Sequence, residues 1–411
     1  MFEQEPMRAA LGRVNAWLSS HAASYSPLGE TELTRFEFRM KAMVEICLYL
    51  HLSQAFGADA LMPDRLHATV RACVGSRAFL DKLLVNPAQT ALYIPSILPF
   101  REEEPFRGLA QYYKSVCKPF HNEQMPFQAL CHAYTCDALG LYDAGIAALE
   151  ADAIRTSALH LPPGSLSTPP EGAYPFTHSA FYATRFGTRP LALSEAQRRA
   201  LEDYSDIELC KAFALKNMDA ALEIVMARVY LFGRLTARDA VVIESALSLL
   251  DEKGHIRSPK ISETAVLGGA ESEWEGCYHT MIVAGMLLMS LGFARHPPTA
   301  VAAGDGRQLE DCALAMDAVG TMYAAVEHGS LALAVFVLSK LGDLPAEFAP
   351  PAREVAPILA WMRGLAGIHK ARRAAGDGGL LGMSDGEFAT VTALFDQAAA
   401  RLEDGYRRAA R

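Results

Sequence analysis

Apolar residues recur every three to four positions along almost the whole chain, a period that fits helices and leaves little room for a sheet. Between residues 31 and 56, apolar side chains keep this period while Glu37, Lys41 and Glu45 follow one another along a different face. This pattern is typical of a long amphipathic helix. Because β-branched runs are short and lie within such stretches, the sequence predicts an all-α protein.

Other helices are expected wherever the same period returns. Serines followed three positions later by Gln or Glu form capping boxes, which predict helix starts at Ser194, Ser205 and Ser384. The remaining helices are expected at about residues 7–21, 62–75, 103–116, 123–155 with a break near Gly140, 206–232, 236–252, 272–294, 307–341 with a break near Gly329, 352–373 and 385–409.

Most of the connections between these helices are short, so that neighbouring helices should run antiparallel as helical hairpins. Such hairpins can close into an α/α toroid or stack into an open α-solenoid. Helical periodicity alone does not separate the two arrangements. The absence of a fixed repeat favours the toroid, with the open solenoid as the alternative.

Five prolines between residues 161 and 176 interrupt the helices and predict an extended loop. The chain is accordingly expected to consist of an N-terminal helical half, residues 1–160, this proline-rich loop, and a C-terminal helical half, residues 177–411. The loop is either a binding loop or a linker between lobes, and the two halves are expected to form one continuous helical array.

Charge and hydropathy limit the partners that the protein can have. The net charge is -9 and no helix carries a cluster of Lys or Arg, which argues against nucleic acid. The longest apolar run, about residues 281–294, is too short to span a bilayer. The acidic start lacks the pattern of a secretory signal, and the eight cysteines show no paired spacing. A cytoplasmic protein that binds neither nucleic acid nor membrane is expected, with its oligomeric state left open.

A first polar block runs from Thr177 to Gly187. On a helix, His178, Tyr182 and Arg185 would share one face, because they stand at positions i, i+4 and i+7. His178 near a helix start could act as a base, Tyr182 could donate a proton or bind an oxyanion, and Arg185 could hold an acidic group. Phe181 and Thr184 add binding surface, although a histidine on a partly buried helix is often structural.

A second polar block, residues 271–280, leads into an apolar helix. Glu275 stands four residues before His279, a spacing at which the carboxylate could orient the imidazole or raise its pKa. Trp274 and Tyr278 offer an aromatic substrate wall, and Tyr278 could bind a developing oxyanion. The alternative is a simple ion pair on a core helix. Each block follows a long irregular stretch, so that both helix starts could meet at one site.

No cofactor is expected from motifs, since a Walker A loop, a dinucleotide fingerprint, a His-Glu-x-x-His helix and a Gly-x-Ser-x-Gly elbow are all missing. Zinc remains an alternative through Cys277 and His279, which together offer soft ligands. A zinc site needs three or four converging ligands, and the spacing of these two does not supply them.

The first block resembles the Thr-His-x-x-Phe-Tyr-x-Thr-Asp-Phe-Gly signature of a bacterial family of helical proteins of unknown function, often found near natural-product gene clusters. The second block resembles that family's Glu-x-Tyr-His-Thr segment through Tyr278, His279 and Thr280, with Glu275 at a comparable place. Arg185 stands where the signature has an acidic residue. The positions of the first block that match are Thr177, His178, Phe181, Tyr182, Thr184, Phe186 and Gly187.

Together these features predict a biosynthetic enzyme of specialised metabolism. It would do acid/base chemistry of the lyase, cyclase or isomerase type on a small-molecule, peptide or carrier-bound intermediate, with His178 and His279 as the proton-transfer groups. The alternative is a non-enzymatic helical scaffold that binds a peptide or a protein partner. Convergence of the two blocks in an enclosed pocket would favour the enzyme.

Overall fold

The computed structural model of the chain is almost entirely helical, which confirms the predicted all-α class. It describes residues 4–85, 92–116, 125–162, 164, 166, 172–258, 270–293, 298–300, 306–328, 330, 333–334, 336–338, 352–374 and 384–409. The choice between a toroid and an open solenoid stays a prediction.

Two compact units share the chain. Unit 1 takes segments from both sides of the proline-rich loop, whereas unit 2 takes part of the loop and segments that follow it. Unit 1 comprises residues 1–161, 174–194 and 218–302. Unit 2 comprises residues 162–173, 195–217 and 303–411. The predicted division into two consecutive halves remains an interpretation of the loop, part of which (residues 163, 165 and 167–171) lies outside the described residues.

Unit 1 contains most of the helices. The α-helices are α1 Gln4–Ser20, α2 Leu33–Phe56, α3 Asp64–Val74, α4 Arg77–Val85, α6 Phe106–Val116, α7 Pro126–Ala138, α8 Ala144–Thr156, α9 Ala173–Ala183, α11 Met218–Phe232, α12 Ala237–Lys253 and α13 Ala270–Gly292. Three 3-10 helices are η1 Ala22–Tyr25, η2 Asp59–Leu61 and η3 Ile94–Phe100. A short parallel pair joins β1 Arg234–Leu235 to β2 Thr299–Ala300, with Arg234 opposite Thr299.

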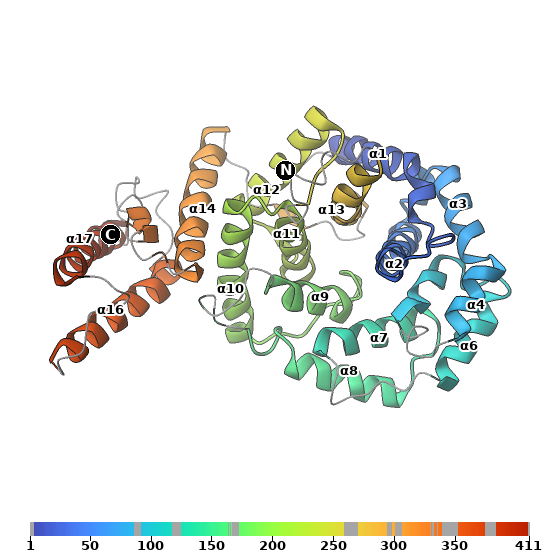
Figure 1. Cartoon of the computed structure of the whole chain (residues 1–411), viewed down its shortest axis with the longest axis horizontal. Coiled ribbons are helices and arrows are strands. Elements are labelled where there is room, and N and C mark those ends of the chain that lie inside the picture. Colours follow the sequence, from blue (N-terminus) through green and yellow to red (C-terminus); the bar gives the residue numbers. More distant parts are fainter. Residues whose placement is uncertain are drawn as a thin grey trace. The chain divides into compact units, whose positions relative to one another are not determined.

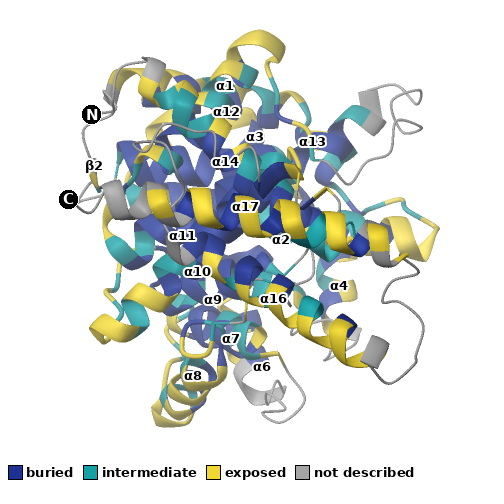
Figure 2. Ribbon diagram, turned by 90° about the vertical axis from the view of Figure 1, so that its left-hand side faces the viewer, coloured by how far each residue is buried: buried dark blue, intermediate teal, exposed yellow. Residues whose placement is uncertain are grey.

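The core of unit 1 is built around α13, which packs against α1, α2 and α11. Almost every described position of α13 from Trp274 to Leu291 is buried, as expected for a helix that is apolar on all sides. In Figure 1, α2, α9, α11 and α13 surround the middle of this unit, while α1, α3 and α8 lie outside them. Figure 2 shows the resulting contrast between α11, which is buried along its length, and the exposed outer face of α8.

Unit 2 contains α10 Glu195–Ala214, α14 Gly306–Glu327, α16 Ala352–Ala374 and α17 Asp385–Ala409. Its main contact joins α10 to α14. A Cβ atom at Gly320 would collide with the backbone carbonyl of Cys210, so that glycine allows these two helices to approach closely. The Tyr323 hydroxyl donates a hydrogen bond to the Glu354 carbonyl, 2.7 Å away, and ties α14 to α16.

Several helix predictions agree with the structure and two need correction. The expected break at Gly140 is confirmed, since this glycine has φ +70° between α7 and α8. The helix expected over 206–232 is instead two helices, because Lys216 adopts a left-handed φ of 53° between α10 and α11. Ser205 does not start a helix, for it lies inside α10 and its hydroxyl donates to the Glu202 carbonyl, 3.1 Å away.

Other predictions concern parts of the chain that the structure describes only partly. The break expected near Gly329 lies outside the described residues, as do residues 259–269 ahead of the second polar block. Both α4 and η3 were not expected, because each is shorter than the windows in which a helical period stands out. None of the helices in the described part of the chain has the length and apolar character needed to cross a membrane.

Candidate active site in an apolar cavity of unit 1

A cavity of about 360 Å³ lies between α2, α9, α11 and α13, with residues 92 and 93 ahead of η3 completing its wall. Most of its lining is apolar or aromatic. The lining residues are Lys41, Val44, Glu45, Leu48, Leu92, Tyr93, His178, Phe181, Tyr182, Phe186, Glu223, Met226, His279, Ile282, Val283 and Met286.

Helical spacing explains how these side chains reach one space. From α2 come the residues at 41, 44, 45 and 48, and from α13 those at 279, 282, 283 and 286, each set following i, i+3, i+4 and i+7. Each of these two helices therefore presents one face, over two successive turns, to the cavity. Helices α9 and α11 contribute fewer lining residues.

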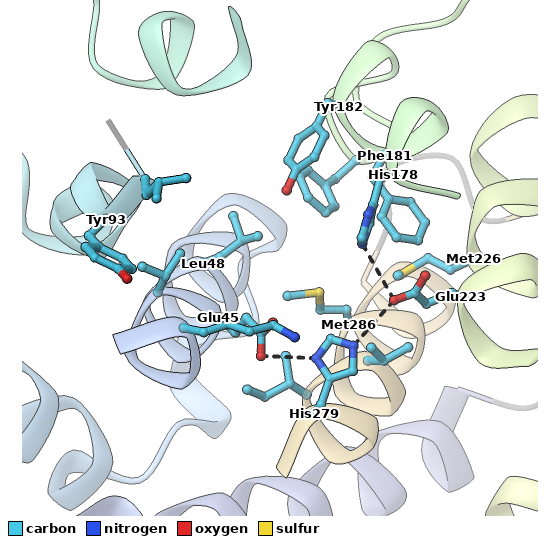
Figure 3. Close-up of a pocket in the computed structure, with 16 residues that line it drawn as sticks. Glu45, Leu48, Tyr93, His178, Phe181, Tyr182, Glu223, Met226, His279 and Met286 are labelled. Atoms are coloured by element: carbon cyan, nitrogen blue, oxygen red, sulfur yellow. Dashed lines mark hydrogen bonds and ion pairs between the residues drawn. The ribbon is translucent and has the colours of Figure 1, made fainter. Parts of the chain in front are cut away.

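The polar end of the cavity is organised by His279 (Figure 3). Its Nδ1 atom lies 3.1 Å from Oε2 of Glu45 on α2. Its Nε2 atom faces α11, where it is 3.5 Å from Oε1 of Glu223 and 3.7 Å from Oδ1 of Asp219. One imidazole on α13 thus connects carboxylates from two other helices.

His178 approaches the same carboxylate from α9, with its Nε2 atom 3.8 Å from Oε1 of Glu223. The histidines of the two polar blocks therefore meet across one glutamate, and Figure 3 shows both rings directed at it. Lys41 lies one turn before Glu45 on α2, with its Nζ atom 3.6 Å from that carboxylate. These groups account for the charge at the polar end.

Three hydroxyl groups hold the carboxylates of α11 in place. The Thr177 hydroxyl donates to Oε2 of Glu223, 2.7 Å away. The Tyr174 hydroxyl donates to Oδ2 of Asp219 at 3.0 Å, and the Thr280 hydroxyl donates to Oδ1 of the same residue at 3.1 Å. Hydroxyl groups close in the sequence to each histidine thereby orient the carboxylates that the histidines face.

The pKa values at this end are perturbed by burial and by the close charges. Burial opposes ionisation of His279, yet Glu45, Asp219 and Glu223 raise its pKa well above the usual value. Burial, together with the charge of Glu223, raises the pKa of Asp219. For Glu45 and Glu223 burial again opposes the charge, but the neighbouring histidines hold both pKa values below normal.

Four of the residues predicted from the sequence line the cavity: His178, Phe181, Tyr182 and His279. His178 packs on Tyr182 with ring centroids 6.3 Å apart. Burial raises the pKa of Tyr182 well above its usual value, so that the phenol keeps its proton and can donate a hydrogen bond. The expectation that His178 lies near a helix start is wrong, because α9 begins at Ala173 and His178 stands in its middle.

The aromatic residues of the second block lie behind the polar end and do not line the cavity. Trp274 is fully buried and stacks on Tyr278 with ring centroids 4.9 Å apart. Tyr25 and Phe38 close around both rings. Burial first, and then the charge of Glu45, raise the pKa of Tyr278. This aromatic cluster supports the helix that carries His279.

The expected pair between Glu275 and His279 is not formed. Glu275 lies 3.5 Å from Arg35, while His279 is turned toward the carboxylates of α2 and α11. Cys277 is buried away from the histidine cluster, and burial raises the pKa of its thiol to about 11. A thiol that keeps its proton is a poor metal ligand at neutral pH.

The end of the first block turns away from the cavity. Helix α9 ends at Ala183, and Arg185 adopts a left-handed φ of 52°, so it does not share the helical face of His178. Its Nε atom lies 2.8 Å from Oδ2 of Asp137, and its Nη1 atom 2.8 Å from Oε1 of Glu150. The arginine is thus buried in a separate ion cluster.

Thr184 and Gly187 complete this helix end. The Thr184 hydroxyl donates to the Ala180 carbonyl, 2.6 Å away, and accepts from the backbone N–H of Gly187 at 3.1 Å. Gly187 has φ +80°, and a Cβ atom there would lie 2.5 Å from the ring of Tyr230. The left-handed backbone and the close approach both require glycine.

Three acidic residues of the site were not predicted from the sequence: Glu45, Asp219 and Glu223. Glu45 was noted only as part of a charged helix face. Glu223 carries a signal that could have found it, because it is a single acid within the otherwise apolar run from Ala220 to Ala227. A carboxylate on a helix that is apolar on every face is buried, and a buried charge is unfavourable unless a partner pairs with it.

Two of these acids, together with His279, also form a group with the geometry of metal ligands. Asp219, Glu223 and His279 each offer one ligand atom, and these atoms all lie within 4.8 Å of one another. Two of these residues, Glu223 and His279, line the cavity, which gives the group access to a bound molecule.

Comparison with known proteins identifies the family. The model of a family described as "Domain of unknown function (DUF6895)" matches residues 11–289, and the chain belongs to this family. The match includes all the residues of the cavity. No curated protein and no solved structure matches the chain significantly.

Proposed function

We propose that the chain is an enzyme that carries out acid/base chemistry, of the lyase, cyclase or isomerase type, on a small molecule bound in the cavity of unit 1. One observation carries this proposal: His178 and His279, from separate sequence blocks, meet across Glu223 at the polar end of an otherwise apolar cavity. Pockets of this composition, with a few converging polar groups, are typical of sites that bind and convert small molecules.

His178 is the residue that we assign to proton transfer. Its side chain is 31% exposed, which leaves the ring accessible from the cavity, and its Nε2 atom faces only one carboxylate among the ion pairs described above. His279 has carboxylates at both ring nitrogens and serves better to position charge. Tyr182 donates a hydrogen bond to a substrate oxygen on the same side.

The size of the cavity favours a small molecule over a peptide segment. A volume of about 360 Å³ is near the lower end of the range of roughly 300–1,000 Å³ for drug-sized ligands. Leu48, Phe181 and Met226 would contact an apolar body, while a polar group would lie near Glu223. A carrier-bound intermediate would place only its tail here. The place in bacterial specialised metabolism is proposed from the resemblance of the two motifs, and the cytoplasmic location from the cysteines without paired spacing.

The experiment that tests this proposal replaces His178 in the native producer. A strain carrying His178→Gln is compared with the parent strain by mass spectrometry of small-molecule extracts. We expect a product to disappear and its precursor to accumulate, because removal of a positioned proton-transfer group typically slows a reaction by about 10²–10⁴-fold.

The matched control is His160→Gln, which changes an exposed histidine of unit 1 that does not line the cavity. It should leave the extract unchanged. If folded His178→Gln also leaves product formation unchanged, the proposal fails and the alternative of a non-enzymatic scaffold is favoured.

A further inference from the structure

We propose that Asp219, Glu223 and His279 bind a divalent first-row transition-metal cation at the polar end of the cavity. The proposal goes beyond the acid/base function, since it concerns a ligand that can be measured without any substrate. It rests on three observations: the spacing of the ligand atoms, the residues that orient them, and the balance of charge.

The spacing fits a shared cation better than direct hydrogen bonds. The Nε2 atom of His279 lies 3.5 Å and 3.7 Å from the facing oxygens of Glu223 and Asp219, beyond the usual hydrogen-bond range of about 2.7–3.2 Å. Two ligand atoms that are each about 2.0–2.2 Å from one cation are separated by roughly 3–3.5 Å. A small inward movement of these side chains would complete the coordination.

The supporting residues are those of a metal site. Glu45 accepts from Nδ1 of His279, which directs Nε2 toward the carboxylates, and such a carboxylate–histidine arrangement commonly supports a metal-bound imidazole. The hydroxyls of Tyr174 and Thr177 each hold one oxygen of Asp219 or Glu223. The Oε1 atom of Glu223, on the other hand, faces the histidines.

The charge at the polar end also calls for a cation. Glu45, Asp219 and Glu223 bring three carboxylates, all largely buried, whereas Lys41 and protonated His279 bring two positive charges, so that one negative charge remains. A divalent cation that replaces the proton of His279 would bring the balance to zero. Buried charges that are neither paired nor coordinated are strongly unfavourable.

The ligand set indicates which class of cation is bound. One imidazole with two carboxylates suits zinc, manganese, iron or cobalt, whereas magnesium and calcium prefer oxygen ligands alone. Three protein ligands leave coordination positions for a molecule in the cavity, as in catalytic zinc sites. His178 lies outside the group of three and stays available for proton transfer.

The test is calorimetric titration of the full chain, freed of metal with a chelator, by ZnCl₂ and separately by MgCl₂. We expect Zn²⁺ to bind in a one-to-one ratio and Mg²⁺ to bind at least tenfold more weakly. His279→Gln and Glu223→Gln should each weaken Zn²⁺ binding by at least tenfold. The matched control is His255→Gln, in which the changed histidine pairs with Glu273 outside the cavity, and it should bind as the parent does.

A second variant and a spectrum keep the test decisive if a ligand variant fails to fold. Glu45→Gln retains all three ligands and should weaken Zn²⁺ binding by about 10- to 100-fold through loss of orientation. The Co²⁺ form should show visible bands from nitrogen and oxygen ligands without the intense near-ultraviolet band of a thiolate. The proposal is overturned if Zn²⁺ does not bind the folded chain, if Glu45→Gln binds it unchanged, or if a thiolate band appears and disappears in Cys277→Ala.

Discussion

The middle of helix α9 and the turn that follows it contact two very different groups of charges. At the middle, His178 faces an excess of carboxylates next to a cavity. Just beyond its end, Arg185 and Arg189 meet Asp137 and Glu150, so that two positive charges balance two negative ones. We call the first group the site cluster; it consists of His178, His279 and the carboxylates of Glu45, Asp219 and Glu223. We call the second group the anchor cluster; it consists of Arg185, Arg189, Asp137 and Glu150. A balanced cluster holds the end of the helix, whereas an unbalanced one that faces a cavity is suited to bind a ligand.

The pKa of Glu150 supports this distinction. Burial opposes its charge, but hydrogen bonds from Arg189 and Tyr142 hold its pKa below the normal value. The anchor cluster therefore satisfies its acids within the chain. In the site cluster, the histidines likewise hold the pKa values of Glu45 and Glu223 below normal against the effect of burial, but burial and the neighbouring Glu223 raise the pKa of Asp219. The contrast can be tested by comparing what each cluster contributes to stability.

The largest effect is expected at the centre of the anchor cluster. Arg185→Met should lower the free energy of unfolding by about 3–5 kcal/mol, because it leaves buried Glu150 with one fewer partner. Chemical denaturation of the full chain measures this loss. Arg155→Met is the control, since Arg155 forms an exposed pair with Asp152, and it should change stability by less than about 1 kcal/mol.

A third buried cluster, in unit 2, also has more acidic than basic groups. Glu208 and Glu327 share Lys211, and burial raises the pKa of Glu208 to about 7 from an ordinary value of 4.5. Between these two pH values the folded chain binds more protons than the unfolded one, so the contribution of Glu208 to stability falls as pH rises.

Because of Glu208, the free energy of unfolding should decrease by roughly 3 kcal/mol between pH 4.5 and pH 7. Glu208→Gln should remove it, and denaturation curves at several pH values measure the difference. Glu195→Gln, at an exposed position of the same helix, should keep the pH dependence of the parent. An unchanged slope in Glu208→Gln would contradict this account.

The turn that follows α9 should show a smaller effect. Gly187→Ala should destabilise the chain by about 2 kcal/mol, because its backbone is left-handed and the added Cβ meets Tyr230. Gly140→Ala has the same backbone strain with open space around it, and should lose only about 1 kcal/mol. Thermal or chemical unfolding distinguishes the two, and equal losses would show that contact with Tyr230 is unimportant.

The smallest effect on stability is expected within the site cluster itself. Asp219→Asn should change the free energy of unfolding by about 1 kcal/mol or less in the absence of added metal, because it removes one of several crowded carboxylates and retains an oxygen that can accept from Thr280. If Asp219→Asn lowers the free energy of unfolding as much as Arg185→Met does, the site cluster stabilises the fold as the anchor cluster does, and the comparison is wrong.

Much of the fold could be predicted from the sequence, because helical periodicity is a local property. The long helix near residues 31–56 and the break at Gly140 both agree with the structure. The divided helix over 206–232 was missed, since the apolar period continues through Lys216 and only its left-handed backbone separates α10 from α11. A local pattern does not reveal such a conformation in a residue other than glycine.

The site could be predicted only in part, for a physical reason. His178, Tyr182 and His279 stand out because they are titratable or polar groups clustered in short blocks. Glu45 and Asp219, however, reach them from α2 and α11 through tertiary packing, which no local spacing encodes. The prediction for Arg185 is wrong for the opposite reason. It assumed that the helix continues through residue 185, whereas the left-handed backbone there directs the side chain to Glu150 and away from the cavity.

The left-handed turn after α9 has a consequence for how the site can change over evolutionary time. Arg185, Phe186 and Gly187 all have positive φ, so the far end of the helix is fixed in direction. Inserting or deleting one residue between His178 and Ala183 would rotate the imidazole by about 100° around the helix axis and out of reach of Glu223. Changes of length beyond Arg189, the last residue of the anchor cluster, would not be transmitted in this way, so the segment that leads to α10 can vary in length while the register of the histidine is preserved.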